Sequence, residues 1–236
     1  MKQVKLEQGQ LDHGDFVDMQ VTQLKKLLFQ EDIQFDSKDA IVDMGGGSGC
    51  FAARLTDLTP KICVYDTDGN ALGRCDRDLV LPVCSDALNP KIEDDVKLVC
   101  FNLILHHLVD GTEKEIRGMQ TKALSFWSKR YLFVYEYCYE SFIDGLSGKL
   151  IYWITKSKCL SFLCKLVSFF ISSLRANTFG VGIRFRSKKE WIDLFESKGF
   201  TLLGVSAMEE DRDGVDWPFR LLLIKEIRRI GFLLTA

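Results

Sequence analysis

Hydrophobic positions along the chain follow two different periods. Over residues 16–28, Val17, Val21, Leu24 and Leu28 recur every three or four positions, which predicts an amphipathic helix at the start. Short apolar runs bounded by turn residues predict strands. We expect these strands at 40–44, 61–66, 79–83, 96–105 and 130–138.

Helical segments separate these apolar runs. We expect a helix from about residue 50, a short helix after the strand at 61–66, and a helix over 112–127. Strands and helices that alternate at these lengths are typical of a parallel sheet with helices on both faces.

The last fifty residues have a different order. Residues 187–198 have helical spacing and end at Gly199, a common stop signal for a helix. Two apolar runs follow at 200–208 and 219–227, joined by the polar stretch EEDRDGVDWP. Their spacing predicts an antiparallel strand pair at the edge of the sheet.

Composition narrows the class of protein. The 236 residues are 47% hydrophobic and 27% charged, which suits one globular domain. A net charge of −2 argues against a general nucleic-acid binder. The first residues have no apolar signal-peptide core, so we expect a cytoplasmic protein. Eight scattered cysteines and three histidines predict free thiols and no metal site.

A glycine-rich turn follows the strand at 40–44. Asp43, Gly45, Gly47 and Gly49 have the spacing of an acid followed by GxGxG. Glycine permits a sharp turn and the close approach of a ligand, and a following helix presents free N–H groups. The aspartate disfavours a diphosphate and favours a ligand with a positive group, such as S-adenosylmethionine. A plain tight turn is the alternative.

Polar residues also follow the next three strands. Asp66 ends the second strand, where an acid can accept hydrogen bonds from both ribose hydroxyls. Asp86 follows the third strand and can accept from an adenine amino group, and Asn102 lies at the mouth of the fourth strand. Open α/β sheets bind ligands at the carboxyl ends of their parallel strands. We therefore expect these side chains to converge there.

The chain resembles the class I S-adenosylmethionine-dependent methyltransferases. The resemblance rests on VDMGGGSG, VYDTD, CSDA and FNLILHHLV, and covers roughly residues 38–138. It implies an α/β, Rossmann-like sheet of seven strands, mostly parallel, with a terminal antiparallel pair and a helical lid inserted before the last helix. One departure is Lys97, which stands where the family often has an aspartate, usually of structural importance.

The resemblance also implies the cofactor, S-adenosylmethionine, and its binding residues. Asp43, Gly45, Gly47 and Gly49 would surround the methionine part. Asp66 would hold the ribose, Asp86 and Ala87 would flank the adenine, and Asn102 would line the methyl end. We expect a single domain over 1–236, with a helical cap (1–37), a cofactor-binding core (38–140), the lid (141–186), and a final helix with the strand pair (187–236).

Candidate acceptor-handling residues follow the fourth and fifth strands. His106 and His107 are the general-base candidates, because an oxygen acceptor can require a base. Capping and packing are the alternative roles. Tyr135 and Tyr137 lie where such enzymes often shape the acceptor pocket, and strand alternation places Glu136 on the opposite face. Ordinary aromatic packing explains the tyrosines equally well.

The inserted segment is strongly basic. Residues 141–189 contain nine cations and one anion, a net charge of +8, together with long apolar runs. Three interpretations remain open: a lid over a lipophilic acceptor, a surface that rests on an anionic membrane, and a buried helical pair or subunit contact. Arg184 and Arg186 are candidates for binding an acceptor carboxylate or phosphate, or for a solvated face.

We expect from this a methyltransferase that acts on a small or lipophilic, anionic acceptor. The alternative is an inactive S-adenosylmethionine-binding scaffold or regulatory protein. An NAD-dependent oxidoreductase is a weaker alternative, because Ala52 stands where a third glycine is usual. The methylated atom and the oligomeric state are left open.

Overall fold

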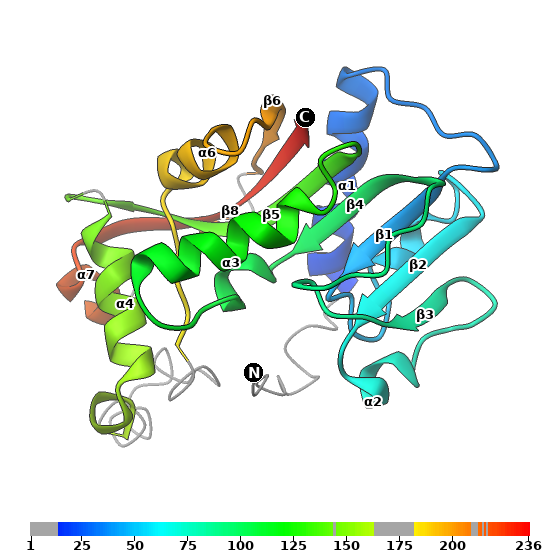
Figure 1. Cartoon of the computed structure of the whole chain (residues 1–236). Coiled ribbons are helices and arrows are strands. Elements are labelled where there is room, and N and C mark those ends of the chain that lie inside the picture. Colours follow the sequence, from blue (N-terminus) through cyan, green and yellow to red (C-terminus); the bar gives the residue numbers. More distant parts are fainter. Residues whose placement is uncertain (1–13, 144, 163–181, 209–211, 214, 216) are drawn as a thin grey trace.

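A sheet of mostly parallel strands with helices on both faces organises the chain (Figure 1). The computed structural model describes residues 14–143, 145–162, 182–208, 212–213, 215 and 217–236. The strands along the sheet have the order β3-β2-β1-β4-β5-β8-β6. They are β1 (Ala40–Met44), β2 (Lys61–Asp66), β3 (Leu81–Cys84), β4 (Val96–Asn102), β5 (Tyr131–Ser141), β6 (Thr201–Ser206) and β8 (Ile224–Thr235).

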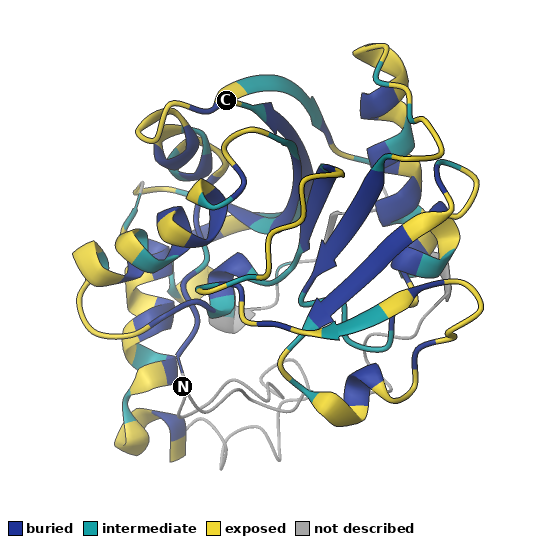
Figure 2. Ribbon diagram, turned by 45° about the vertical axis from the view of Figure 1, so that its right-hand side comes forward, coloured by how far each residue is buried: buried dark blue, intermediate teal, exposed yellow. Residues whose placement is uncertain are grey.

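Strand directions confirm the predicted architecture. The pairs from β3 to β5 are all parallel, and β8 runs antiparallel to both of its neighbours, β5 and β6. A two-residue strand, β7 (Arg212–Asp213), also pairs with β8. All five residues of β1 are buried, as expected for a central strand covered on both faces. Figure 2 shows this burial along the middle of the sheet.

Helices cover each face through separate apolar clusters. On one face, α1 (Gly14–Gln30) buries Leu24 and Leu27 against the sheet, beside the 3-10 turn η2 (Ala52–Leu55) and the short α2 (Gly69–Leu72). On the other face lie α3 (Glu113–Ser125) and α6 (Lys188–Glu196). Both α3 and α6 begin with a capping box, which satisfies the N–H groups that a helix start leaves unpaired.

Two sequence predictions need correction. The helix expected from about residue 50 is only the four-residue η2, because Pro60 and the start of β2 at Lys61 leave little room for a longer one. The last apolar run was expected as a strand at 219–227. Instead, α7 (Trp217–Leu221) occupies its beginning, and β8 starts at Ile224 after Leu223, whose φ is +63°.

Other strand ends differ by a few residues. The third strand covers 81–84, and the fourth ends at Asn102 because Leu103 has a φ of +53°. A 3-10 turn, η3 (Leu105–His107), follows it.

In the insertion, α4 (Leu146–Lys156) is helical, but residues 163–181 of the expected lid lie outside the described residues. None of the described helices has the length and apolar character needed to cross a membrane.

Candidate functional site

The glycine turn after β1 has the backbone geometry that the sequence predicts. Gly45, Gly47 and Gly49 have φ values of +72°, +56° and +79°, a region that strains other residues. A side chain at Gly46 would collide with the Asp43 carboxylate. A Cβ at Gly47 would meet nothing within 4 Å, so the backbone of the loop is open to a close ligand there.

Asp43 and Asn102 form a buried polar pair behind this turn. Asn102 Nδ2 donates a hydrogen bond of 3.1 Å to Asp43 Oδ1. Asp43 Oδ2 and Asn102 Oδ1 are buried and have no hydrogen-bond partner among the described residues. Two buried acceptors without donors favour a cationic, hydrogen-donating ligand, because an unsatisfied buried acceptor is costly.

The pKa of Asp43 reflects its burial. This pKa is raised to about 7, because burial, together with the charge of Asp66, outweighs the hydrogen bond from Asn102. The unfolded chain would release the proton near 3.8, so this group lowers stability as pH rises from there towards 7. An ammonium group beside Oδ2 would favour the carboxylate form.

We therefore expect affinity for S-adenosylhomocysteine to depend on pH through Asp43. From about pH 7 down to about pH 5.5, binding should weaken by up to about tenfold per pH unit, because Asp43 must lose its proton when the ligand binds. Asp43→Asn should bind more weakly and show little change across this range. Calorimetric titration at each pH measures the affinity of both proteins. If the affinity of the variant fell with pH as steeply as that of the wild type, the role of Asp43 would be contradicted.

Asp66 connects the end of β2 to the glycine turn. Its Oδ2 accepts from Gly47 N at 3.0 Å, and its Oδ1 accepts from Asp68 N at 2.8 Å. A carboxylate has about four acceptor positions, so two remain for ribose hydroxyls. Asp68 instead caps α2, where its Oδ1 accepts from Asn70 N at 2.9 Å. The structure thus assigns separate tasks to these two acids.

A pocket of about 120 Å³ lies at the carboxyl ends of β1, β2 and β3. It brings Gly45, Asp66, Asp86 and Ala87 together, as expected from the sequence. The other lining residues are Met44, Tyr65, Thr67, Ser85, Ile104 and Leu108. The sequence analysis did not single these out, although most of them directly adjoin the motif residues.

The pocket fits part of the expected cofactor. Its volume is below the roughly 300–1,000 Å³ that is common for ligand sites, so it suits a nucleoside end rather than the whole molecule. The side chain of Ile104 fills the place where a Cβ on Gly45 would lie. Ile104 and Gly45 both line the pocket, so Ile104 forms its wall at the start of the glycine turn. The acceptors on Asp43 and Asn102 then suit the ammonium of the methionine part.

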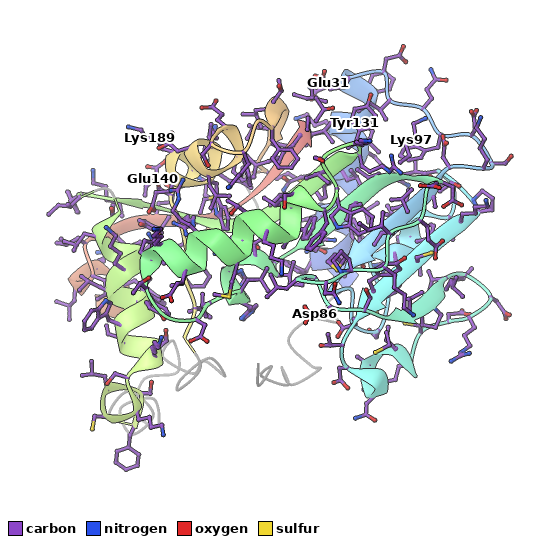
Figure 3. All side chains as sticks on the ribbon, viewed as in Figure 1. Glu31, Asp86, Lys97, Tyr131, Glu140 and Lys189 are labelled. Carbon is purple, nitrogen blue, oxygen red and sulfur yellow. The ribbon has the colours of Figure 1, made fainter. Side chains whose placement is uncertain are left out.

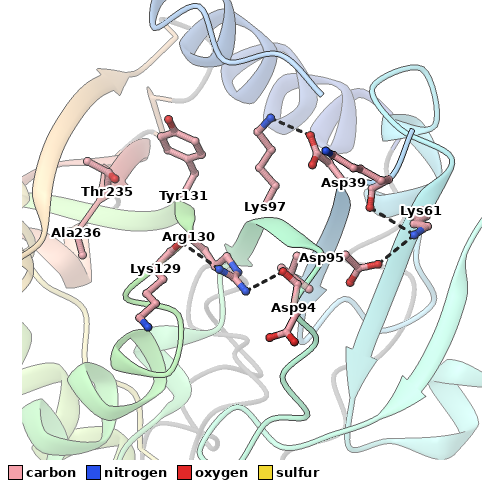
Figure 4. Close-up of a pocket in the computed structure, with 12 residues that line it drawn as sticks. Asp39, Lys61, Asp94, Asp95, Lys97, Lys129, Arg130, Tyr131, Thr235 and Ala236 are labelled. Carbon is pink, nitrogen blue, oxygen red and sulfur yellow. Dashed lines mark hydrogen bonds and ion pairs between the residues drawn. The ribbon is translucent and has the colours of Figure 1, made fainter. Parts of the chain in front are cut away.

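A larger depression lies at the opposite edge of the sheet (Figure 4). It has a volume of about 700 Å³, and Lys97 and Tyr131 border it, across the sheet from Asp86 (Figure 3). Lys97, which stands where the family often has an aspartate, forms an ion pair here, with 2.8 Å between its Nζ and Asp39 Oδ2. This depression lies at the amino ends of the parallel strands, away from the edge where such sheets bind ligands.

His106 is held by a buried carboxylate. Its Nδ1 lies 2.6 Å from Glu136 Oε2, while Glu136 Oε1 accepts from Leu105 N at 2.7 Å. Glu136 is fully buried, and the sequence analysis assigned it no role. A lone carboxylate within the apolar run FVYEYC was the available signal. Burial, and then the neighbouring His106, hold the pKa of His107 well below its usual value.

The tyrosines expected at the acceptor differ in their surroundings. Tyr135 is fully buried, and its ring centroid lies 6.2 Å from those of both Phe16 and Phe133. This burial favours the packing alternative for Tyr135. Tyr137 is partly exposed and lies 6.0 Å from His106 and 5.5 Å from Phe185, measured between ring centroids. Its contact with an acceptor stays a prediction.

Arg184 and Arg186 are not surface residues, and the prediction that they meet an acceptor or a membrane is corrected. Both are fully buried. Arg184 donates to Glu113 at 2.9 Å and to Glu190 at 2.6 Å. Arg186 donates to Glu113 at 2.7 Å and makes two bonds to Gln120. Their charges are neutralised inside the protein by Glu113, about seventy residues earlier in the sequence, and by the nearby Glu190.

Cysteines and histidines form no further site in the described residues. The seven described cysteines make no disulfide, and Cys50, Cys84 and Cys159 are exposed. Within the described ranges, no group of three histidine, cysteine or acidic side chains is arranged to hold a metal ion.

Comparison with solved structures places this geometry in a known context. No model of a known protein family and no curated protein matches the sequence. An S-adenosylmethionine-dependent methyltransferase from Leishmania major matches with a TM-score of 0.57 and 14% identity, covering 96% of this chain and 75% of that one. Magnesium protoporphyrin IX methyltransferase from Synechocystis, solved with bound S-adenosylhomocysteine, matches with a TM-score of 0.52 and 13% identity. The match covers 100% of this chain and 90% of that one.

The fold is that of the class I methyltransferases. A pericyclic reaction enzyme also matches, with a TM-score of 0.53 and 13% identity, over 90% of this chain and 46% of that enzyme. Identities this low establish the shared architecture and leave chemistry to the site itself.

Proposed function

We propose that this protein transfers a methyl group from S-adenosylmethionine to a small or lipophilic acceptor. The main support is the pair of buried acceptors, Asp43 Oδ2 and Asn102 Oδ1, behind a glycine turn that is open to a ligand at Gly47. The pocket that contains Asp66 and Asp86 supports the same cofactor. When bound, S-adenosylmethionine would supply an activated methyl group for in-line displacement.

The chain's own contribution to chemistry would come from His106. A hydrogen bond from Nδ1–H to Glu136 leaves the lone pair of the imidazole on Nε2. Nε2 could then accept the proton of an acceptor hydroxyl as the new bond to carbon forms. Tyr137 and Phe185, whose rings lie near His106, favour an aromatic or otherwise apolar acceptor. Arg184 and Arg186 give no support to an anionic group on it.

Methyl transfer can be tested without knowing the acceptor. Fractions of a cell metabolite extract are incubated with methyl-labelled S-adenosylmethionine, and label in products and release of S-adenosylhomocysteine are measured. We expect acceptor-dependent release by the wild-type protein. His106→Gln should reduce turnover by about 10²–10⁴-fold while leaving cofactor affinity unchanged.

The matched variant His107→Gln should retain most of the turnover, because His107 has no comparable carboxylate partner among the described contacts. Cofactor binding without label transfer from any fraction would contradict the proposal and favour the scaffold or regulatory alternative. Equal turnover in both histidine variants would remove the base role from His106 and leave methyl transfer standing.

A further inference from the structure

The helix α4 is firmly attached through one of its faces. Ser147 Oγ donates to Leu222 O at 2.7 Å, and Tyr152 OH donates to Gly111 O at 2.8 Å. Gly148 leaves room for the carbonyl of Phe185, where any side chain would collide. These contacts fix the orientation of the helix. They also place it beside the loop that follows His106, and Figure 1 shows it where β5 and β8 extend past the other strands.

The opposite face of α4 is apolar and exposed. Leu146, Leu150 and Trp153 follow one another at helical spacing, and Trp153 is 71% exposed. Phe142 and Ile143 continue the surface before the helix, at 70% and 51% exposure. We call these five residues the α4 outer face. A cluster of large exposed apolar side chains is unusual on a protein surface and indicates an interaction site.

Lysines lie beside the α4 outer face. Lys149, Lys156 and Lys158 lie on or directly after the helix, and Lys225 Nζ lies 4.2 Å from the ring centroid of Phe142. From residue 145 to residue 162 the sequence contains no acidic residue, and Asp144 is the last acid before this stretch. Lys156 points to the attached face, because its Nζ lies 2.6 Å from Tyr152 OH and 3.8 Å from Asp110 Oδ1. Lys149, Lys158 and Lys225 therefore remain as the cations for the outer face. Apolar side chains framed by cations match an anionic lipid surface.

We propose that the α4 outer face docks on the surface of an anionic lipid bilayer. Trp153 and Phe142 would enter the interfacial region while the lysines meet lipid phosphates, as amphipathic helices do at membrane surfaces. A two-fold contact between copies of this chain fits less well, because it brings the same lysines against one another. If the proposed methyl transfer holds, the helix would also present the site to lipophilic acceptors in the membrane.

Vesicle co-sedimentation tests the proposal with defined lipids. The full chain is mixed with vesicles of phosphatidylcholine alone, or of phosphatidylcholine with phosphatidylglycerol, at low salt. We expect binding to the anionic vesicles, a blue shift of tryptophan fluorescence, and loss of binding as salt rises. Lys149→Glu and Lys158→Glu should each weaken binding by at least about fivefold.

Variants separate docking from general stickiness. Leu150→Ser with Trp153→Ser should abolish binding. Phe29→Ser changes an aromatic residue on α1 that is even more exposed, at 87%, and should bind like the wild type. Absence of wild-type binding to anionic vesicles, or equal binding by the Leu150 and Trp153 double variant, would overturn the proposal. A dimer in light scattering that this variant abolishes would assign the face to self-association instead.

Titration with S-adenosylhomocysteine checks each of these variants. Unchanged affinity would show that the cofactor pocket is intact, so a failure of membrane docking is distinguished from a failure of the proposed function.

Discussion

Glu113→Gln is expected to lower the free energy of unfolding by about 3 kcal/mol, the lower end of the range for breaking a buried ion pair. The change removes one charge that both Arg184 and Arg186 contact, and these arginines are fully buried. We choose the lower end because about a third of the Glu113 side chain remains exposed, where water screens the interaction. Urea unfolding measures the change.

A matched control separates charge loss at this site from charge loss in general. Glu31→Gln alters an exposed glutamate on the opposite side of the sheet from α3 and should change stability by less than about 0.5 kcal/mol. Adding Arg186→Met to Glu113→Gln should recover part of the lost stability, because it removes a buried charge and retains apolar volume. Equal effects of Glu113→Gln and Glu31→Gln would contradict the importance of the network.

The same network predicts sensitivity to acid. Burial acts to raise the pKa of Glu113 and of Glu190, but the arginines outweigh it, so both pKa values fall below their ordinary value of 4.5. Their stabilisation is therefore present above about pH 4.5 and is lost as pH falls through the lower pKa values of the folded protein. Glu113→Gln should show a shallower loss of stability over this range.

Asp66→Ala should reduce affinity for S-adenosylhomocysteine at least about tenfold. Loss of a charged hydrogen-bond acceptor removes roughly 1.5–3 kcal/mol, and Asp66 would accept two ribose hydroxyls. Its bonds to Gly47 N and Asp68 N also hold the glycine turn against β2, so their loss acts in the same direction. Calorimetry gives the affinity, and circular dichroism shows whether the variant is folded.

Asp68→Ala is the matched control for this prediction. Asp68 caps α2 and does not line the pocket, so we expect a small effect on affinity and a modest loss of stability, about 1 kcal/mol. If Asp68→Ala weakened binding more than Asp66→Ala, the assignment of the ribose acceptor would be wrong.

The central strands could be predicted closely from the sequence because turn residues mark both ends of each short apolar run. The runs at 40–44 and 61–66 coincide with β1 and β2. The final strand could not be placed in the same way. The run FRLLLIKEI is apolar enough for either a helix or a strand. Its beginning lies in α7, and its end becomes β8 through pairing with β5 and β6.

The site shows the same division between local and distant causes. Asp66, Asp86 and Gly45 converge because their places at strand ends follow from the order of the strands. The burial of Arg184 and Arg186 depends on hydrogen bonds to Glu113 and Gln120, about seventy residues earlier in the chain. Sequence spacing does not reveal such partners. Glu136 was likewise recognisable as a buried acid only once His106 was placed beside it.

The most direct test of this account is a calorimetric titration of the wild-type chain with S-adenosylhomocysteine and, separately, with NAD. The buried acceptors on Asp43 and Asn102 suit the ammonium group of the first ligand and offer nothing to a diphosphate. We expect saturable binding of S-adenosylhomocysteine and no measurable heat with NAD. Binding of NAD, with no response to S-adenosylhomocysteine, would contradict the cofactor assignment on which the proposed methyl transfer rests.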